Sequence, residues 1–314
     1  MNPEAHLQFA CFGGVASIHV RDSDEEQGRR LAERGRELLL DAHRRLSRFE
    51  PASELSRLNR DPRTAVPASP LLRKLAAAVL TAGMRSGGLV DATLLDAIER
   101  AGYRSSLDAA KPPPPRAALA ARNQAPARAS AAAGWSAVSV DAQAGTVIRP
   151  PGVRIDGGGI AKGLLADLVG AELAATEAFA VECCGDVRLG GSSALRRRIK
   201  VDDPFGAEPL HEFEIRTGAV ATSGITRRSW EEGGASLAHQ ILDPASGRPA
   251  FTGIVQATAL APTALEAEIL AKSALLSGPE AAEGWLPFGG VLVPVVGEAE
   301  VIAGAQSLAG AVAA

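Results

Sequence analysis

Cysteine and aromatic residues are scarce in this chain of 314 residues. Only 4% of the residues are Phe, Trp or Tyr, and the three cysteines are Cys11 and the adjacent Cys183 and Cys184. Three thiols at this spacing fit neither a disulfide framework nor a tetrahedral zinc site. We therefore expect buried, reduced thiols, which are typical of a cytosolic protein.

Long apolar runs, a secretion signal and a strong charge of either sign are also lacking. No stretch approaches the roughly 18 uninterrupted apolar residues of a membrane helix. The opening "MNPEAHLQFACFGG" has neither the basic start nor the apolar core of a signal peptide. The formal net charge of -3 gives no reason to expect nucleic acid or an acidic membrane as a partner. These absences predict a cytoplasmic protein that binds no nucleic acid.

Lysine is rare beside arginine. It occurs only at Lys74, Lys111, Lys162, Lys200 and Lys272. Arginine is thus the usual cation of this chain, and a lysine marks a position where a compact ammonium group is preferred.

What is present is the pattern of a globular protein with mixed α and β structure. Apolar periodicity and capping residues predict helices over residues 25–46, 70–86, 161–174 and 263–276. Strands are expected in "LQFACFGGVASIHV", "WSAVSVD", "GTVIRP", "VRID", "AFAVEC", "DVRLGG", "RRRIKVD", "HEFEIRTGAVATSG" and "GIVQATALAP". The strands first pair with neighbours and then alternate with helices, which indicates the mixed class.

One low-complexity segment interrupts this series. Residues 108–134, "DAAKPPPPRAALAARNQAPARASAAAG", contain a proline run that cannot continue a helix. We interpret them as a Pro/Ala-rich surface insertion between two parts of one fold. A linker between independent domains is the alternative.

The stretch "RIDGGGIAKG" places three glycines between Asp156 and Lys162. At the start of a helix, glycines let backbone N–H groups approach an anion, and Lys162 could neutralise phosphate oxygens. The spacing matches neither the Walker loop nor the dinucleotide fingerprint. A tight turn that packs the helix on a sheet is the alternative.

Other stretches carry polar groups at the ends of expected elements. "SGGLVDATLLDAI" places Asp91 at a glycine-rich turn, where a helix cap is the simpler interpretation. "AVATSGITRRSW" places the hydroxyls of Thr222 and Ser223 at a strand end, where they could meet a ligand. "TALEAEILAKSALLSG" places Glu268 and Lys272 four residues apart on one helix face, the spacing of an ordinary ion pair.

Taken in order, these stretches resemble the ApbE family, the FAD:protein FMN transferases. The resemblance runs from "FACFGG" near Phe9 through "LSRFEPASELSRLN", "GGLVDAT", "DGGGIAKG", "ECCGDVRLGG", "VATSG" and "ILDPASGRP" to "AEILAKSALLSG" near Gly278. It implies an α+β, ApbE-like (T-fold-related) mixed sheet with packed helices, in one large catalytic domain over residues 1–314. FAD would lie between the helical and sheet-rich parts.

The resemblance also implies a reaction. Family members bind FAD, use Mg²⁺ to polarise its diphosphate, and transfer FMN to a threonine or serine of an acceptor flavoprotein with release of AMP. The implied FAD contacts are Leu89, Val90, Asp91, Asp156, Lys162 and Leu242. The implied metal ligands are the Gly159 carbonyl and the positions of Glu268 and Lys272. We expect a monomer or homodimer.

Three departures from the family pattern stand out. The late helix of the family reads Ala-Asp-x-x-x-Thr, whereas this chain has Glu268 and Lys272. A protonated lysine cannot ligate a metal, so our hypothesis is that its ammonium takes over part of the metal's charge-neutralising role. The family's Met-Gly-Thr is Phe12-Gly13-Gly14 here, and Phe12 could stack on a ring of FAD.

The third departure removes a histidine. The family's His-Ile-Ile-Asp-Pro reads Gln240-Ile241-Leu242-Asp243-Pro244 here, and glutamine cannot act as a base. His239 and Asp243 are therefore the candidate bases for the acceptor hydroxyl, and Lys162 is the third candidate catalytic residue. An FAD pyrophosphatase that yields FMN and AMP, and a non-catalytic FAD-binding protein, are the alternatives to FMN transfer.

Overall fold

An eight-stranded sheet forms the centre of the computed structural model, which describes residues 4–105, 113–193, 195–232 and 236–308. Each strand pair in this sheet is antiparallel. In spatial order the strands are β1 (Glu4–Cys11), β2 (Gly14–Arg21), β6 (Ala178–Cys183), β7 (Asp186–Gly190), β10 (Gly218–Gly224), β15 (Ile254–Ala261), β16 (Gly290–Pro294) and β17 (Glu300–Ile302).

The first two strands form a hairpin with a two-residue turn. Cys11 pairs with Gly14, and the turn residues Phe12 and Gly13 have φ angles of 51° and 70°. Positive φ at both positions is typical of the tight hairpin turns that match the twist of their strands. The expected strand "LQFACFGGVASIHV" is thus divided into two strands by a turn at Phe12 and Gly13.

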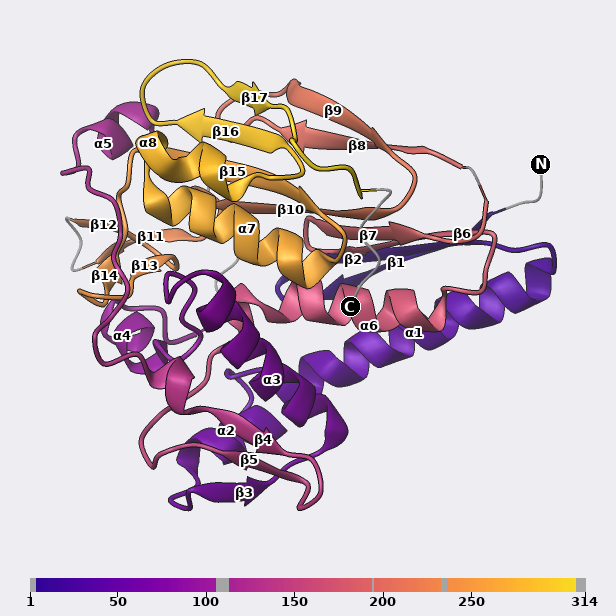
Figure 1. Ribbon diagram of the computed structural model, residues 1–314, viewed down its shortest axis with the longest axis horizontal. Coiled ribbons are helices and arrows are strands. Elements are labelled where there is room, and N and C mark those ends of the chain that lie inside the picture. The colour runs from indigo at the N-terminus through magenta and orange to yellow at the C-terminus, as the bar shows by residue number, and fades with distance from the viewer. Residues whose placement is uncertain (1–3, 106–112, 194, 233–235, 309–314) are drawn as a thin grey trace.

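Helices cover one face of the sheet. They are α1 (Glu25–Leu46), α6 (Ala161–Glu172) and α7 (Ala264–Ser277), as Figure 1 shows. Alternation along β10 explains the layering: Ala219 and Ala221 belong to the core beneath the helices, whereas Val220 belongs to a core on the opposite face. The small side chains of β10 let α7 approach the sheet closely.

A hairpin covers part of the opposite face. It consists of β8 (Arg197–Asp202) and β9 (Pro209–Ile215). Ile199 and Phe213 pack there against Leu189 and Leu260 of the sheet. The central strands are therefore buried on both faces, and all eight residues of β15 are buried.

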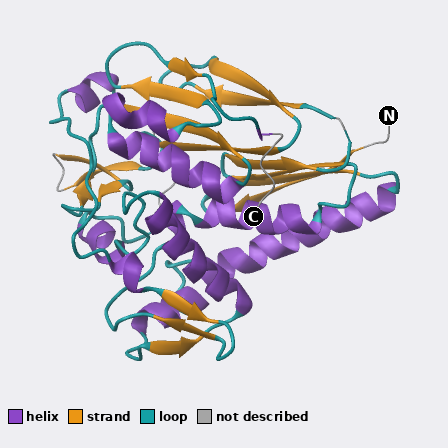
Figure 2. Cartoon of the chain, viewed as in Figure 1, coloured by secondary structure: helices purple, strands orange, loops and turns teal. Residues whose placement is uncertain are grey.

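A smaller lobe lies beside the helical layer (Figures 1 and 2). It contains α2 (Glu54–Arg60), α3 (Pro70–Arg85) and a three-stranded sheet of β3 (Ala65–Pro67), β5 (Thr146–Ile148) and β4 (Ser139–Asp141). The Ser69 hydroxyl caps α3 by accepting from the backbone N–H of Leu72 at 3.2 Å. Leu72 and Leu75 then join the main core.

Short elements complete the described chain. They are α4 (Leu95–Arg100), α5 (Arg116–Ala120), α8 (Pro279–Ala282), the 3-10 turns η1 (Gly134–Ala137), η2 (Gly157–Gly159) and η3 (Glu283–Trp285), and the strand pairs β11 (Ser229–Glu232) with β12 (Ser236–His239) and β13 (Leu242–Asp243) with β14 (Arg248–Pro249). Among the described residues, no helix combines the length and the apolar content that crossing a membrane requires.

The four expected helices are confirmed within a few residues, and the α+β class is confirmed. Two expectations are wrong. The sheet is antiparallel rather than mixed, because its neighbouring strands are joined either by hairpins, as β1 to β2 and β6 to β7, or by a helix that returns the chain in the opposite direction, as α7 does between β15 and β16. Residues 153–156 ("VRID") form no strand, because Ile155 bonds to the side chain of Asn59 and Asp156 bonds to the backbone of Ala92 instead of to a sheet.

The Pro/Ala-rich segment contacts the body of the protein where it is described, from residue 113 onward; residues 108–112 lie outside the described part. Leu119 is buried in a core with Phe251. The backbone N–H groups of Ala125 and Ala127 donate to the carbonyls of Phe251 and Leu276 at 2.9 and 2.8 Å. The segment is thus held across the ends of β15 and α7.

Candidate functional site

A cavity of about 690 Å³ lies where the start of α6, the middle of α7 and the end of β10 meet. It is lined by most of the residues predicted for the site, namely Leu89, Val90, Asp91, Asp156, Gly159, Lys162, Thr222, Ser223, Leu242, Glu268 and Lys272. These residues come from five separate stretches of sequence. A concave site of this size can hold a dinucleotide.

The glycine turn η2 lines the cavity, and the side chain of Asp156 holds its backbone in place. The Asp156 carboxylate accepts from the backbone N–H of Gly158 at 2.9 Å, and the guanidinium of Arg48 lies 3.5 Å from it. The preceding residue, Ile155, is held by both ends of the Asn59 amide at 2.8 Å each. Side chains from the smaller lobe therefore set the position of the turn.

A buried ionic cluster lies at the start of α6. The Lys162 ammonium donates to Asp186 and lies 3.6 Å from Oε1 of Glu268. The other oxygen of Glu268 accepts from the backbone N–H of Gly163 at 3.0 Å. Asp186 also accepts from the backbone N–H of Thr222 at 3.3 Å. The cluster therefore joins α6, α7, β7 and β10.

Burial and pairing act in opposite directions on the pKa values of this cluster. Burial alone would lower the pKa of Lys162, but Asp186 and Glu268 outweigh it and raise that pKa above its ordinary value. Burial raises the pKa of Asp186 to about 6, although Lys162 opposes the shift. Lys162 therefore remains an ammonium at neutral pH.

Lys272 approaches the glycine turn from α7. Its ammonium donates to the backbone carbonyl of Gly159 and lies 3.9 Å from Oε1 of Glu268. A Cβ atom on residue 159 would lie only 2.7 Å from the Lys272 nitrogen, so the missing side chain makes room for it. Burial lowers the pKa of Lys272, and the carboxylate of Glu268 opposes that shift.

The groups predicted as metal ligands, namely the Gly159 carbonyl, Glu268 and Lys272, do not fit Mg²⁺. Magnesium requires near-octahedral oxygen ligands at about 2.0–2.1 Å, yet the Gly159 carbonyl already accepts from the Lys272 ammonium. Glu268 is engaged by Gly163 and faces two lysines. Across the part of the chain that the structure describes, no three His, Cys, Asp or Glu side chains form a set that could hold a metal ion.

Asp91 and the hydroxyl residues occupy other parts of the wall. Both the backbone N–H and the hydroxyl of Thr93 donate to Asp91, so Asp91 closes its own turn and does not cap α4. Burial raises the pKa of Asp91. Thr222 and Ser223 line the sheet side of the cavity, and the Thr222 hydroxyl lies 2.9 Å from that of the fully buried Thr258.

Three predicted residues do not line the cavity. His239 is fully buried with its ring 4.8 Å from that of Phe251, and burial lowers its pKa to about 3. Asp243 accepts from the backbone N–H groups of Arg128, Ala245 and Ser246 and so closes a turn. Phe12 packs edge-on against His43. Gln240, one residue after His239, does line the cavity.

Comparison with known proteins identifies a family that includes these site residues. The ApbE family profile matches residues 12–290. The chain belongs to the ApbE family. An FAD:protein FMN transferase of Haemophilus influenzae is 26% identical over 90% of this chain and 80% of its own length. One of Treponema pallidum is 32% identical over 46% of this chain, a match that spans only 43% of that relative.

The likeness extends to the whole fold. The crystal structure of an ApbE protein from Thermotoga maritima superimposes with a TM-score of 0.77 at 25% identity, and the match covers 96% of this chain and 97% of that one. The expected ApbE-like α+β fold is therefore confirmed.

Other residues of this ApbE-family cavity were not predicted as site residues. Arg198, Lys200, Arg227 and Arg228 all line it. The runs "RRRIKVD" and "GITRRSW" contain them, and a basic run beside a strand end was the available signal. Cys184 also lines the cavity, and its hydrogen bond with Cys183 lowers the pKa of Cys184. The three cysteines are free thiols.

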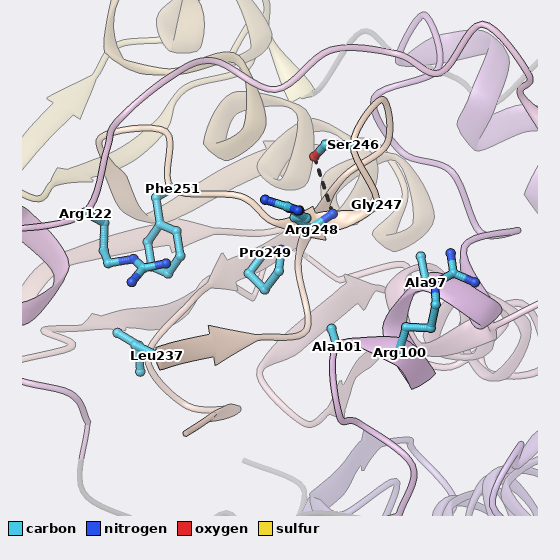
Figure 3. A pocket seen from close by; sticks show the side chains of 10 residues that line it. All are labelled: Ala97, Arg100, Ala101, Arg122, Leu237, Ser246, Gly247, Arg248, Pro249 and Phe251. Atoms are coloured by element: carbon cyan, nitrogen blue, oxygen red, sulfur yellow. Dashed lines mark hydrogen bonds between the residues drawn. The ribbon is translucent and has the colours of Figure 1, made fainter. Parts of the chain in front are cut away.

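A second cavity of about 450 Å³ lies beside α4 and β14. Figure 3 shows Arg100, Arg122 and Arg248 around it, with the Arg122 guanidinium beside the ring of Phe251. None of the residues predicted for the site lines this cavity. The larger cavity is therefore the candidate active site.

Proposed function

We propose that this ApbE-family chain is an FAD:protein FMN transferase, which moves FMN from FAD to a threonine or serine hydroxyl of an acceptor flavoprotein and releases AMP. The observation that carries the proposal is the convergence of Lys162, Lys272 and the glycine turn on one cavity large enough for a dinucleotide. Relatives that bear this activity by name match the chain over 80% and 43% of their lengths.

The cavity offers a complementary surface to each part of FAD. Apolar side chains of Leu89, Val90, Ile98 and Leu242 suit a flat ring system. The two lysines and the start of α6 suit a diphosphate, since a helix start and ammonium groups both attract anions. The described arginines on the wall would add to this attraction at long range.

The transfer step requires mainly positioning and charge stabilisation. The acceptor oxygen bonds to the phosphorus of the FMN half, and the bond from this phosphorus to the bridging oxygen breaks. The electron pair stays on the bridging oxygen, which leaves with AMP, and the hydroxyl proton passes to water. Fixed cations near the bridging oxygen stabilise the charge that develops on it.

This proposal does not use His239 or Asp243 as the base. His239 is sealed in the core next to Phe251, and Asp243 is held by three backbone N–H groups. Neither side chain lines the cavity. Lys162 is a catalytic residue in this account, because it lines the cavity and its raised pKa keeps it charged.

Incubation of the purified chain with FAD and a candidate flavoprotein that has a threonine or serine flavinylation site tests the proposal. Transfer gives a fluorescent protein band in a denaturing gel and one AMP for each FMN attached. Free FMN with AMP would instead identify an FAD pyrophosphatase. FAD that remains bound and intact would identify a non-catalytic flavin-binding protein.

A further inference from the structure

The contact between Lys272 and Gly159 brings a fixed positive charge to the mouth of the glycine turn. The ammonium donates to the Gly159 carbonyl, while its nearest carboxylate oxygen, on Glu268, is 3.9 Å away and beyond hydrogen-bond length. One N–H of the ammonium is therefore used by the backbone. Lys272 lines the cavity, so its other N–H groups are available to a ligand there.

The same contact disfavours a divalent ion at this carbonyl. A Mg²⁺ ion bound there would have to displace the ammonium or lie within a few ångströms of it, and the two positive charges would repel each other. The Lys272 side chain projects from α7 and is only 13% exposed, so it is held mainly by protein atoms. Glu268 already balances Lys162 as well as Lys272.

We propose that the Lys272 ammonium takes the place of a divalent metal ion in this chain, so that FAD binds and FMN is transferred without a metal. This inference rests on the function proposed above. In the transfer step, the ammonium donates to the bridging oxygen as the bond from the FMN phosphorus breaks and AMP leaves. Lysine is rare in this chain, and a compact ammonium is the side chain closest to a small cation.

The test begins with the full-length chain after exhaustive treatment with a chelator. FAD affinity is measured by calorimetry in EDTA and in excess Mg²⁺, and transfer is followed as AMP released with a candidate acceptor. We expect FAD affinity and transfer rate in EDTA to lie within about two-fold of their values in Mg²⁺. An absolute requirement for Mg²⁺ in either measurement would overturn the inference.

Two variants sharpen the test. Lys272→Met keeps the length of the side chain and removes the charge. It should weaken FAD binding in EDTA by ten-fold or more, since a hydrogen bond from a charged donor to the diphosphate is lost. Lys272→Thr supplies an oxygen ligand and removes the ammonium, so Mg²⁺ should bind to it and restore FAD affinity. Mg²⁺ titrated into the wild-type chain should give no binding heat.

Lys74→Met is the matched control, because Lys74 is exposed on α3 and does not line the cavity. It should behave as wild type, and thermal unfolding checks that all three variants fold. If Lys272→Met bound FAD as tightly as Lys74→Met in EDTA, the inference would be wrong. FAD bound equally in EDTA and Mg²⁺ without any transfer would contradict the proposed function alone, since the binding data would still support the role of Lys272.

Discussion

Gly163→Ala should damage both the fold and the site, because α6 and α7 touch at this residue. A Cβ atom there would lie 2.5 Å from the carbonyl oxygen of Ala264 and 2.8 Å from Cα of Leu265. Both are backbone atoms of the start of α7. Since non-bonded heavy atoms are in good contact at about 3.5–4.0 Å, the helices would have to separate by about 1 Å.

The separation has a cost that can be estimated. Overpacking a tight contact typically costs about 1–3 kcal/mol, and replacing glycine by alanine within a helix returns about 0.5–1 kcal/mol. A net loss of about 1–2 kcal/mol in the free energy of unfolding is expected. Movement of α7 would also stretch the hydrogen bond from Gly163 to Glu268 and shift Lys272, and a displacement of about 1 Å can cost about 100-fold in rate.

Gly28→Ala is the control. Gly28 lies within α1, and a Cβ atom there would meet nothing closer than 3.6 Å. The same substitution should therefore raise the free energy of unfolding by about 0.5–1 kcal/mol and leave transfer unchanged. Urea unfolding followed by circular dichroism, with the AMP-release assay, compares the two. Equal stability and equal activity for both variants would refute the argument from close helix contact.

Three more predictions concern the support of the site. Asn59→Ala leaves the buried N–H and carbonyl of Ile155 without partners, and each unsatisfied group costs about 1–3 kcal/mol of folding stability. The urea midpoint should therefore fall clearly, and FAD affinity should fall with it. Unchanged values of both would contradict the role given to Asn59. Lys162→Met leaves Asp186 buried without its cation, which should lower the free energy of unfolding by about 3–5 kcal/mol. Adding Asp186→Leu to this variant should recover part of the loss in the same unfolding assay. Burial lowers the pKa of His239 from 6.5 to about 3, so between these pH values the unfolded chain binds a proton that the native chain does not. The free energy of unfolding should therefore fall as the pH drops below 6.5, and His239→Leu should lack this part of the pH dependence, measured by urea unfolding at about pH 5 and pH 8. The same pH dependence in His239→Leu as in the wild type would count against a neutral buried imidazole.

Local patterns predicted most of the elements. The cap and stop residues of α3 are visible in the sequence because Ser69, Pro70 and Gly87 act through the backbone next to them. The turn at Phe12 and Gly13 is visible for the same reason. Strand direction and the role of residues 153–156 were not predictable in this way, because Asn59 and Ile155 are far apart in sequence and their pairing depends on the folded lobe.

The site, too, was predicted in part, and what the sequence did not predict depends on contacts between distant segments. Asp156, Lys162 and Glu268 come together as the motif order implied. The resemblance placed Gly159 and Lys272 at one site. The direct hydrogen bond from the ammonium to the carbonyl was not predictable, because it depends on how closely α7 approaches the glycine turn. His239 was a candidate base, but neighbouring side chains of an extended segment point to opposite sides: His239 lies in the core, and Gln240 lines the cavity.

FAD titrated by calorimetry into the full-length chain tests the central claim most directly. If the lysines and the glycine turn hold the diphosphate, one FAD should bind for each chain, and Lys272→Met should bind it more weakly than Lys74→Met. An absence of binding heat for FAD, with or without divalent cations, would contradict the account.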